Sequence, residues 1–488
     1  MNLRRTLIVA TVIIGFVGSI LAGRHAQAVT ATRFSTVPFA NRPYSAHRTP
    51  ITTTWYCAGV PAADNTTGGQ IVVANPTDVP INGHITYMNS DGAAPLVQPI
   101  VAPARDKLTL DVESAMTGTF VSAIVELDGG EAMVEQRAIH PAGDAVASCT
   151  TQTSPTWYFA DGWTRDISTE QLVITNPYAD AVSFDVTFYS KNGPLNPGAF
   201  QDDSVEPRSV KVIDVSLKDE SIIGVQVAAS LGRLVVARVA HYAGGGRLGY
   251  SLNLGAPALS EQLWFAEGSG AADVTEKYVI LNPTGQDADV TVAVLGIPQS
   301  STFVAPESIP VPSNSVVTFD TKSIKGLPDL AHSMAFSTAD GKNSIIIERV
   351  LTETVAGQPV TSTVMAMTPE FSFAKRWSLP IGVDAADADA IVVYNPFASA
   401  ATISLKTVGP GGEIAVPGSD AITLPGAGII TIPLTDPSVF GKIVVVDASA
   451  GVYVERRLPR GHGLGGRSGS WALPEECDSC NFSLPPSS

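Results

Sequence analysis

The clearest pattern along this chain is a set of short runs in which hydrophobic and polar residues alternate, separated by Gly, Pro, Asn or Asp. Residues 182–188 read Val-Ser-Phe-Asp-Val-Thr-Phe, and residues 209–215 alternate in a similar way. A period of two is typical of a β-strand with one buried face. Runs with helical length and periodicity are nearly absent, so the sequence predicts an all-β protein built from short antiparallel strands.

This strand pattern recurs four times along the chain. Each copy begins with a Trp-led strand, continues through an Asn-Pro step and closes with an apolar strand that ends in Arg. Self-similarity of this kind predicts a repeat protein. The repeat-motif residues are Trp55, Trp157, Trp264 and Trp377, then Asn75, Asn176, Asn282 and Asn395, and finally Arg137, Arg238, Arg349 and Arg456.

Each copy has about a hundred residues, which is the size of one small domain. We therefore expect a tandem array of four immunoglobulin-like β-sandwich repeats. A β-propeller remains the alternative, because each copy could be split into two four-stranded blades. The expected segments are an export signal or anchor (1–28), a spacer (29–50), the four repeats (51–154, 155–261, 262–374 and 375–476) and a tail (477–488).

A fifth Trp stands near the end of the chain. Trp471 begins a Trp-Ala-Leu-Pro run that resembles the start of a repeat, but no further repeat follows it. Terminal units of repeat proteins need a cap over their open side. We therefore predict that this run is a closing strand for the fourth repeat.

The Asn-Pro steps and the repeated arginines both have structural explanations. Proline has no N–H and ends ladder pairing, while Asn bonds nearby backbone and holds the turn. An Arg that occurs once per repeat is expected to pair with an acid or a carbonyl of its own sandwich. The alternative is a row of guanidinium groups that binds carboxylate or phosphate.

The N-terminus predicts export. Arg4 and Arg5 precede an apolar run over 7–22, and Ala26-Gln27-Ala28 has the small-x-small pattern of a signal-peptidase site. An uncleaved membrane anchor remains open, since the run is at the short edge of a membrane span. Under either alternative we expect an exported protein that is extracellular or associated with the cell envelope.

Four cysteines in an exported chain predict two disulfides. Three pairings are formally open, and we favour Cys57 with Cys149, which would staple the first repeat, and Cys477 with Cys480. The latter pair also resembles a redox motif, but the neighbouring carboxylates disfavour a thiolate.

Charge and motifs argue against several classes of function. The formal net charge of −16 disfavours nucleic acid and anionic membrane surfaces, so any membrane contact is expected only through an uncleaved N-terminal anchor. Gly244, Gly246 and Gly249 match a dinucleotide motif but lead into a strand, so a hairpin turn is expected. Hydrolase signatures are absent. We predict no enzyme activity, no catalytic residue and no cofactor.

Two places in the sequence offer residues that can ligate a metal. Asp384, Asp387 and Asp389 form a small acidic cluster, but the spacing of a calcium loop is missing. His140 and His241 each stand three residues after a repeated Arg, and repeats three and four have no His there. We predict no metal site.

The repeat starts carry a family resemblance. Trp157-Tyr-Phe-Ala-Asp-Gly and Trp264-Phe-Ala-Glu-Gly resemble the Trp-aromatic-Phe-Ala-acid-Gly repeats of uncharacterised exported proteins of actinobacteria. The resemblance covers residues 55–474, and repeats one and four depart from it, for example with Cys57 in place of Phe. It implies a cell-surface or envelope protein, and the strands after the Asn-Pro steps also resemble bacterial adhesion-type immunoglobulin-like modules.

These observations give two functional hypotheses. The first is a non-catalytic exported cell-envelope protein that acts as a structural, scaffold or adhesion-type module, with an envelope protein as partner. The alternative is a multivalent carbohydrate-binding protein whose Trp residues stack on cell-wall glycan. Exposure of the repeated Trp side chains would distinguish the two.

Overall fold

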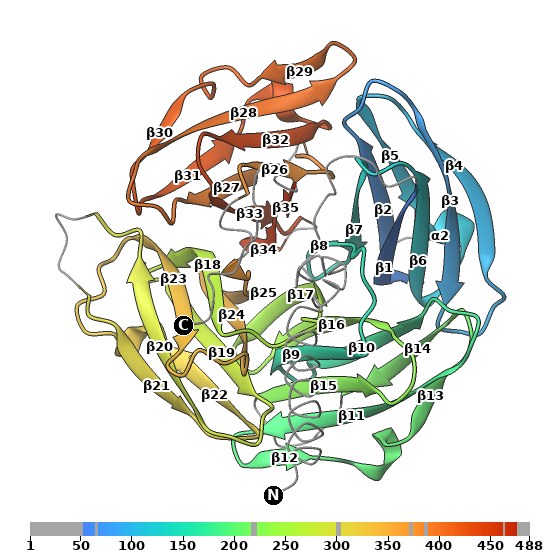
Figure 1. Cartoon of the computed structure of the whole chain (residues 1–488), viewed down its shortest axis with the longest axis horizontal. Coiled ribbons are helices and arrows are strands. Elements are labelled where there is room, and N and C mark those ends of the chain that lie inside the picture. Colours follow the sequence, from blue (N-terminus) through green and yellow to red (C-terminus); the bar gives the residue numbers. More distant parts are fainter. Residues whose placement is uncertain are drawn as a thin grey trace, which may run out of the picture. The chain divides into compact units, whose positions relative to one another are not determined.

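Four β-sandwich repeats follow one another along the chain (Figure 1). The computed structural model describes residues 52–63, 67–215, 222–298, 304–369, 374–384, 389–461 and 464–475. All of them belong to one compact unit, Asn41–Asn481. The expected export signal, spacer and tail lie outside the described residues, as do Cys477, Cys480 and Asp387.

The elements of each repeat are as follows. Repeat one contains β1 (Thr52–Ala62), β2 (Gly68–Asn75), β3 (Ile81–Asn89), β4 (Leu96–Ala102), β5 (Asp106–Asp111), α2 (Val112–Ala115), β6 (Gly118–Asp128), β7 (Met133–Ile139) and β8 (Ala145–Ser148). Repeat two contains β9 (Thr156–Gly162), β10 (Thr169–Asn176), β11 (Val182–Ser190), β12 (Gly193–Leu195), η1 (Gly198–Phe200), β13 (Asp203–Val205), β14 (Ser209–Asp214), β15 (Ile223–Ala229), β16 (Val235–Gly244) and β17 (Arg247–Leu254).

The second half of the chain repeats this order. Repeat three contains β18 (Gln262–Ser269), β19 (Val274–Asn282), β20 (Ala288–Leu295), β21 (Glu307–Val311), β22 (Ser315–Asp320), η2 (Thr321–Ser323), β23 (Ala331–Thr338), β24 (Ile346–Val355) and β25 (Gln358–Met365). Repeat four contains β26 (Arg376–Leu379), β27 (Asp389–Tyr394), β28 (Ala401–Gly409), β29 (Gly412–Ala415), β30 (Ile422–Leu424), β31 (Ile429–Leu434), η4 (Pro437–Val439), β32 (Ile443–Ala448), β33 (Tyr453–Pro459), β34 (Arg467–Trp471) and β35 (Leu473–Pro474).

The main strand order recurs in every repeat, but repeats two and four replace the fourth strand by two short strands, and repeat four adds β35. In repeat one, the first sheet has the order β1-β6-β3-β4 and the second sheet has the order β5-β2-β7-β8. The prediction of an all-β array of sandwich repeats is confirmed. In the seven-strand immunoglobulin order, strands one, two, four and five share a sheet. Here the first and fourth strands lie instead beside the third and sixth, and the seventh has joined the second and fifth. The described strands form neither a closed barrel nor a propeller, because the sheets of each repeat are open and pack face to face in pairs. Repeat three has a core of its own, while the buried residues of repeats one and two form one continuous core.

The alternating sequence pattern determines which side chains enter each core. In β11, Val182, Phe184, Val186 and Phe188 are all buried, while the polar residues between them are partly exposed. Burying large aliphatic and aromatic side chains contributes about 1.5–3 kcal/mol each, so these strands are fixed in register by their apolar face.

The Asn residue of each Asn-Pro step is fully buried and holds the following turn. The side-chain amide of Asn176 donates to the carbonyls of Asp180 at 2.8 Å and Glu206 at 2.9 Å, and its carbonyl oxygen accepts from the N–H of Tyr178 at 3.0 Å. The side chain therefore satisfies backbone groups that proline and the turn leave unpaired. The same pattern of bonds recurs at Asn75, Asn282 and Asn395.

The eighth strands of the four repeats meet at the centre of the unit (Figure 1). β17 pairs in parallel with β25, which joins the second sheets of repeats two and three into one eight-stranded sheet. Arg460 of repeat four lies between the other three repeats. Its guanidinium donates to the carbonyls of Tyr250 at 2.6 Å and of Thr361, and its own carbonyl accepts from the N–H of Asp144 at 2.6 Å. The repeats thus pack around a shared centre.

The chain that follows each eighth strand bridges the free edge of the first strand in its own repeat. Trp471 therefore does not begin a further repeat: it is the last residue of β34, and the next residues form β35, which pairs with β26. The closing contact predicted for the fourth repeat alone is common to all four. The bridged pairs are Tyr56 with Thr150, Tyr158 with Ala256, Trp264 with Met367, and Ser378 with Leu473.

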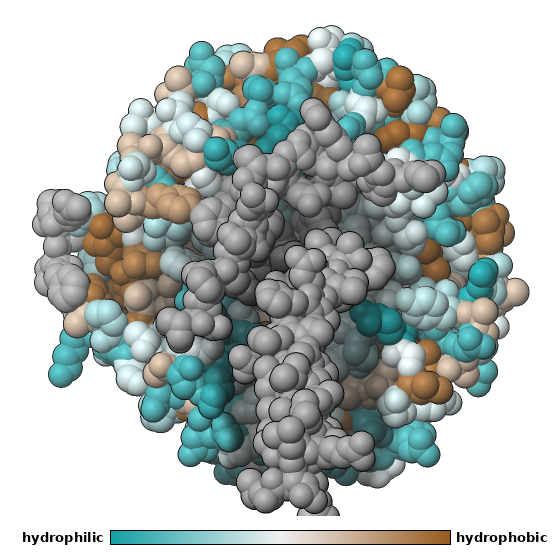
Figure 2. Space-filling model, in the orientation of Figure 1, coloured by the Kyte–Doolittle hydropathy of each residue, from teal (hydrophilic) through white to brown (hydrophobic). Residues whose placement is uncertain are grey.

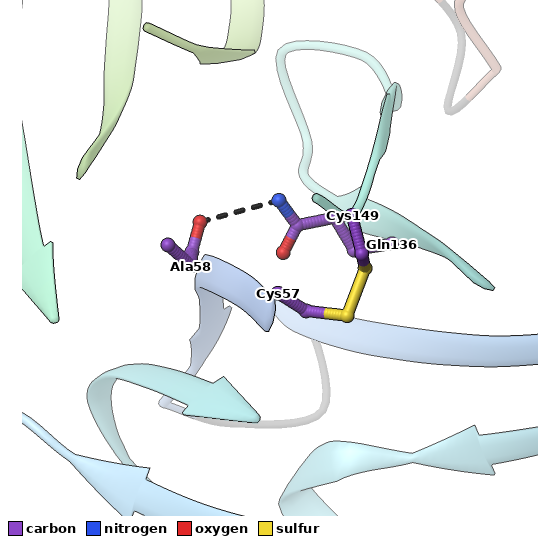
Figure 3. The surroundings of a disulfide bond; sticks show 4 residues. All are labelled: Cys57, Ala58, Gln136 and Cys149. Carbon is purple, nitrogen blue, oxygen red and sulfur yellow. Dashed lines mark hydrogen bonds between the residues drawn. A yellow bond between two sulfur atoms is a disulfide. The ribbon is translucent and has the colours of Figure 1, made fainter. Parts of the chain in front are cut away.

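A disulfide reinforces this closing contact in repeat one (Figure 3). Cys57 of β1 is bonded to Cys149, which follows β8, so the predicted pairing is confirmed. Beside it, the side-chain amide of Gln136 donates to the carbonyl of Ala58 at 3.2 Å.

The visible surface shows no segregation of polar and apolar residues. In Figure 2, hydrophilic and hydrophobic residues are interspersed over the described repeats. Among the described residues, no helix is long and apolar enough to cross a membrane.

Candidate functional site at the junctions between repeats

The strand register identifies the equivalent residues of the four repeats. Arg238 lies opposite Leu172, four residues before Asn176, and Arg349 and Arg456 occupy the matching places in repeats three and four. In repeat one the matching residue is Gln136, opposite Ile71, and Arg137 stands one position later. The grouping of Arg137 with the other three arginines was therefore wrong by one residue.

The repeated Trp residues also fall into two sets. Trp55, Trp157 and Trp377 are equivalent and at most 1% exposed. Trp264 is equivalent to Tyr158, because both bridge the segment after the eighth strand. The side chain of Trp264 therefore lies on the opposite face of its strand from the face that Trp55, Trp157 and Trp377 occupy on theirs.

These Trp side chains are used in packing. The indole N–H of Trp157 donates to the carbonyl of Leu234 at 2.9 Å within repeat two. Trp264 stacks on Tyr453 of repeat four, with ring centroids 5.6 Å apart. The indole N–H of Trp471 donates across to the carbonyl of Met365 in repeat three at 2.8 Å. The three equivalent Trp rings are thus closed to a sugar, and the other two serve contacts between repeats.

A buried ion pair joins repeats two and three. Arg238 donates to both carboxylate oxygens of Glu348, at 2.7 and 2.9 Å, and neither side chain is exposed to solvent. One oxygen of Glu348 also accepts from the backbone N–H groups of Ala160 at 2.8 Å and Asp161 at 2.7 Å. A carboxylate of repeat three thereby accepts from four N–H donors of repeat two, and bidentate geometry of this kind is the strong form of the pair.

Repeats three and four are joined in the same way. Arg349 pairs with Glu455, and Glu455 accepts from the N–H of Glu267 at 3.0 Å. The side chain of Glu267 is held in turn by Arg457 of repeat four, at 2.6 Å. Arg349, Glu455 and Glu267 are buried, and Arg457 is about one-fifth exposed. Arg467 of repeat four also approaches Glu267, at 3.5 Å, and pairs with Glu353 at 2.6 Å, so the network extends to a third arginine and a third glutamate.

The junction between repeats four and one retains only part of this arrangement. Glu135 of repeat one accepts from the N–H of Ile381 in repeat four at 3.0 Å, as its counterparts do. Arg456, however, pairs with Asp389 of its own repeat at 2.8 Å. Pairing with an acid or a carbonyl of the same sandwich was predicted for all the repeated arginines. Arg238 and Arg349 do donate to a carbonyl of their own repeat, that of Asp161 and that of Glu267. Their bidentate or closest acid partners, however, belong to the following repeat.

The junction between repeats one and two carries no such charges. Gln136 stands at the Arg position of repeat one, and Ala237 stands at the Glu position of repeat two. Removing one partner of a buried pair leaves an uncompensated charge, which costs about 3–5 kcal/mol. The joint absence of both charges avoids that cost.

Burial and the neighbouring charges shift the pKa values of several acids and arginines at these junctions. Burial raises the pKa of Glu455 to about 7, although Arg349 opposes this rise. Burial alone would lower the pKa of Arg349, but the negative charges of Glu455 and Glu267 together oppose it, and the pKa is raised. Burial also raises the pKa of Glu170, again to about 7. The partners of Glu455, Arg349 and Glu170 are all buried residues of the protein itself. This arrangement is typical of groups that hold the repeats together.

The remaining candidates from the sequence take structural places. Asp384 pairs with Arg137 at 2.8 Å, and His140 stacks on Tyr250 with ring centroids 4.1 Å apart. Gly244 and Gly246 lie at the hairpin between strands β16 and β17, as predicted. In the described ranges, no group of three or more His, Cys, Asp or Glu side chains is placed to hold a metal ion.

Sequence reasoning missed Glu135, Glu348 and Glu455. The available signal was the Glu that directly precedes Arg in repeats three and four and Gln in repeat one. Neighbouring residues of a strand point to opposite faces. The Glu therefore faces the preceding repeat, while the Arg beside it faces the following one.

Comparison with known proteins gives one result for the chain. A search of curated proteins finds no match. The model of a family of unknown function (DUF5719) matches residues 131–324 and, in a second overlapping match, residues 255–464. Both matches run across boundaries between repeats, and together they cover more than half of the sequence. The chain belongs to this family of unknown function.

Proposed function

We propose that this protein is a non-catalytic, exported component of the cell envelope that acts as a structural scaffold or adhesion-type module. The observation that carries the proposal is the place of the repeated motif. Its Trp, Asn and Arg residues hold each sandwich together or join one sandwich to the next. Such a motif builds a rigid body whose exposed loops are available to a partner.

Export is the second component of the proposal. It rests on Arg4, Arg5 and the apolar run over 7–22. The disulfide between Cys57 and Cys149 supports it, because such bonds persist mainly in oxidising compartments. The envelope partner is expected to be a protein.

The test follows the full chain in cells that normally produce it. Fractionation should place the full chain in the envelope or the medium, and a variant without residues 1–28 should stay inside. Photo-crosslinkers at exposed loop residues Ile167 and Leu231 should then capture a defined envelope protein, while a crosslinker at buried Phe188 should not. A full chain that remains in the cytoplasm would overturn the proposed location. Cleavage of cell-wall polymer by the purified protein would overturn the non-catalytic role.

The alternative glycan-binding function would have to use other residues than the repeat motif. Trp55, Trp157 and Trp377 are buried, so their rings cannot stack on a sugar. Saturable binding to isolated cell-wall glycan, measured in the same preparation, would favour this alternative.

A further inference from the structure

A cleft opens at the junction between repeats two and three. Its volume is about 510 Å³, within the range of about 300–1,000 Å³ that ligand sites occupy. Repeat two contributes Trp163, Arg165 and Arg247, and repeat three contributes Lys277 and a group of Thr side chains. The cleft lies beside the buried pair of Arg238 and Glu348 but includes neither residue.

The cleft exists because one side chain is short. Val350 follows Arg349 and lines the cleft, and its counterpart in repeat four is Arg457. The long side chain of Arg457 reaches Glu267 and fills the matching space between repeats three and four. Asp161, the counterpart of Glu267, is instead held from within repeat two by Arg247, at 2.6 and 3.0 Å.

The walls of the cleft are cationic, in a chain whose net charge is −16. No Asp or Glu is among the described lining residues. Arg247 is committed to Asp161, but Arg165 is exposed to solvent. Lys277 is 3.8 Å from Asp320, with both side chains about 40% exposed, and such a pair is worth little. Arg165 and Lys277 are therefore two cations, one from each repeat, that can meet a negative charge.

The rest of the repeat-three wall is rich in hydroxyl groups. Thr275 and Thr352 lie opposite each other on β19 and β24, and Thr318 and Thr354 extend the row. A Thr hydroxyl both donates and accepts hydrogen bonds, as a sugar hydroxyl does. Trp163 is held rigidly, with the guanidinium of Arg247 4.0 Å from its ring centroid, so it forms a fixed wall.

We propose that this cleft binds an anionic saccharide of one or two sugar units. Its carboxylate or phosphate group would lie between Arg165 and Lys277, and its ring hydroxyls would bond the Thr row. The volume of the cleft exceeds what a bare inorganic anion needs. The row of Thr hydroxyl groups can bond sugar hydroxyls, which a bare anion does not have. The proposal goes beyond the scaffold function and does not depend on it.

The test is calorimetric titration of the full chain with three probes: a galacturonate disaccharide, the neutral disaccharide galactobiose and inorganic phosphate. The galacturonate disaccharide should bind most tightly of the three probes. Added salt should weaken its binding, because salt screens the attraction between its carboxylates and the two cations. Arg165→Gln and Lys277→Met should each weaken binding about tenfold, as expected when about 1.4 kcal/mol is lost. Thr354→Trp should block the cleft. The matched control is Lys325→Met, an exposed cation of repeat three outside the lining, which should bind as the wild type does.

Each other outcome would overturn the proposal. Equal binding of galactobiose would show that charge is not recognised, and equal binding of phosphate would show that the sugar is not. Unchanged affinity in Arg165→Gln and Lys277→Met, or no binding of the galacturonate disaccharide by protein with an unaltered melting curve, would exclude this cleft. The four substituted residues are exposed or half-exposed, so the variants should keep the wild-type melting temperature.

Discussion

The junction between repeats one and two and the junction between repeats two and three solve the same packing problem differently. At the second, Arg238 and Glu348 form a buried bidentate pair. At the first, the matching positions hold Gln136 and Ala237, and both charges are missing. The side-chain amide of Gln136 still donates to a carbonyl of the first strand, as Arg238 does. The hydrogen bond to the first strand is therefore common to both junctions, and the ion pair is an addition.

The comparison also shows that a buried charge is kept or lost as a pair. A desolvated ion pair gives little net stability, but an unpaired buried ion is strongly destabilising. Repeat one carries the disulfide instead, between Cys57 and Cys149. The covalent bond acts within repeat one, whereas the buried ion pairs join repeat two to repeat three and repeat three to repeat four.

Loss of the disulfide is expected to have the largest effect. The bond closes a loop with a sequence separation of 92 residues, and a loop of that length corresponds to about 4.5 kcal/mol. The double variant Cys57→Ser, Cys149→Ser should unfold repeat one at a lower guanidinium concentration than the wild type does. Equilibrium unfolding in guanidinium measures this midpoint. The control is reductant, which should destabilise the wild type and leave the double variant unchanged. A wild type indifferent to reductant would contradict the prediction.

The junction between repeats two and three can be made neutral like its neighbour. Glu348→Gln alone leaves Arg238 buried without an acid, and Arg238→Gln alone leaves Glu348 without a base, so each should cost about 4 kcal/mol. The double variant removes both charges and should recover more than half of that loss. Thermal unfolding of the wild type, the two single variants and the double variant gives the four free energies of a double-mutant cycle. Additive losses would show that the two charges do not depend on each other.

Much of the fold could be predicted from the sequence because its determinants are local. Alternation in β11, the Asn residue before each Pro and the spacing of Cys57 and Cys149 all act within one repeat. Each encodes its structure through a short-range rule: period two for a strand, a side-chain bond to a turn, or one bond per pair of cysteines.

The junctions could not be predicted, because they join residues about a hundred positions apart through packing between repeats. Arg137 was grouped with Arg238 because both are arginines, whereas the register places Gln136 there. Trp264 was grouped with Trp157 for the same reason, and a shift of one residue moves a strand side chain to the other face. Distance from the Asn does not correct the grouping, because Arg137 and Arg238 both stand 62 residues after the Asn of their repeat. Only the strand register separates them.

A third prediction concerns pH and uses a buried acid beside the ion pair. Burial raises the pKa of Glu170 from an ordinary value of 4.5 to about 7. The folded state then binds a proton that the unfolded state has released, so stability is greatest below pH 4.5 and falls as the pH rises through 7. The loss should be on the order of 3 kcal/mol. Melting temperatures between pH 5 and pH 8 should fall in the wild type and stay flatter in Glu170→Gln.

Repeat one lacks this acid, because Gly69 occupies the place of Glu170 there, but burial also raises the pKa of its own Glu135. The control is therefore the variant: hydrogen exchange should show that Glu170→Gln reduces the loosening of repeat two with rising pH and leaves that of repeat one unchanged. The same slope in Glu170→Gln as in the wild type would assign the pH dependence to other groups.

The smallest expected effect concerns the feature that all four repeats share. The amide of Asn282 donates to the carbonyls of Gln286 at 2.8 Å and Val311 at 3.2 Å, and its oxygen accepts from Thr284. Asn282→Ala leaves buried backbone groups unpaired, so it should cost about 2 kcal/mol. Exposed Asn192 gives the matched control, and Asn192→Ala should be neutral within about 0.5 kcal/mol. Because this Asn acts inside one repeat, Asn75→Ala should cost the same as Asn282→Ala in chemical unfolding, whatever the charge of the adjoining junction. A much larger loss in the repeats with ion pairs would show that the junctions, and not the turns, limit the stability of each sandwich.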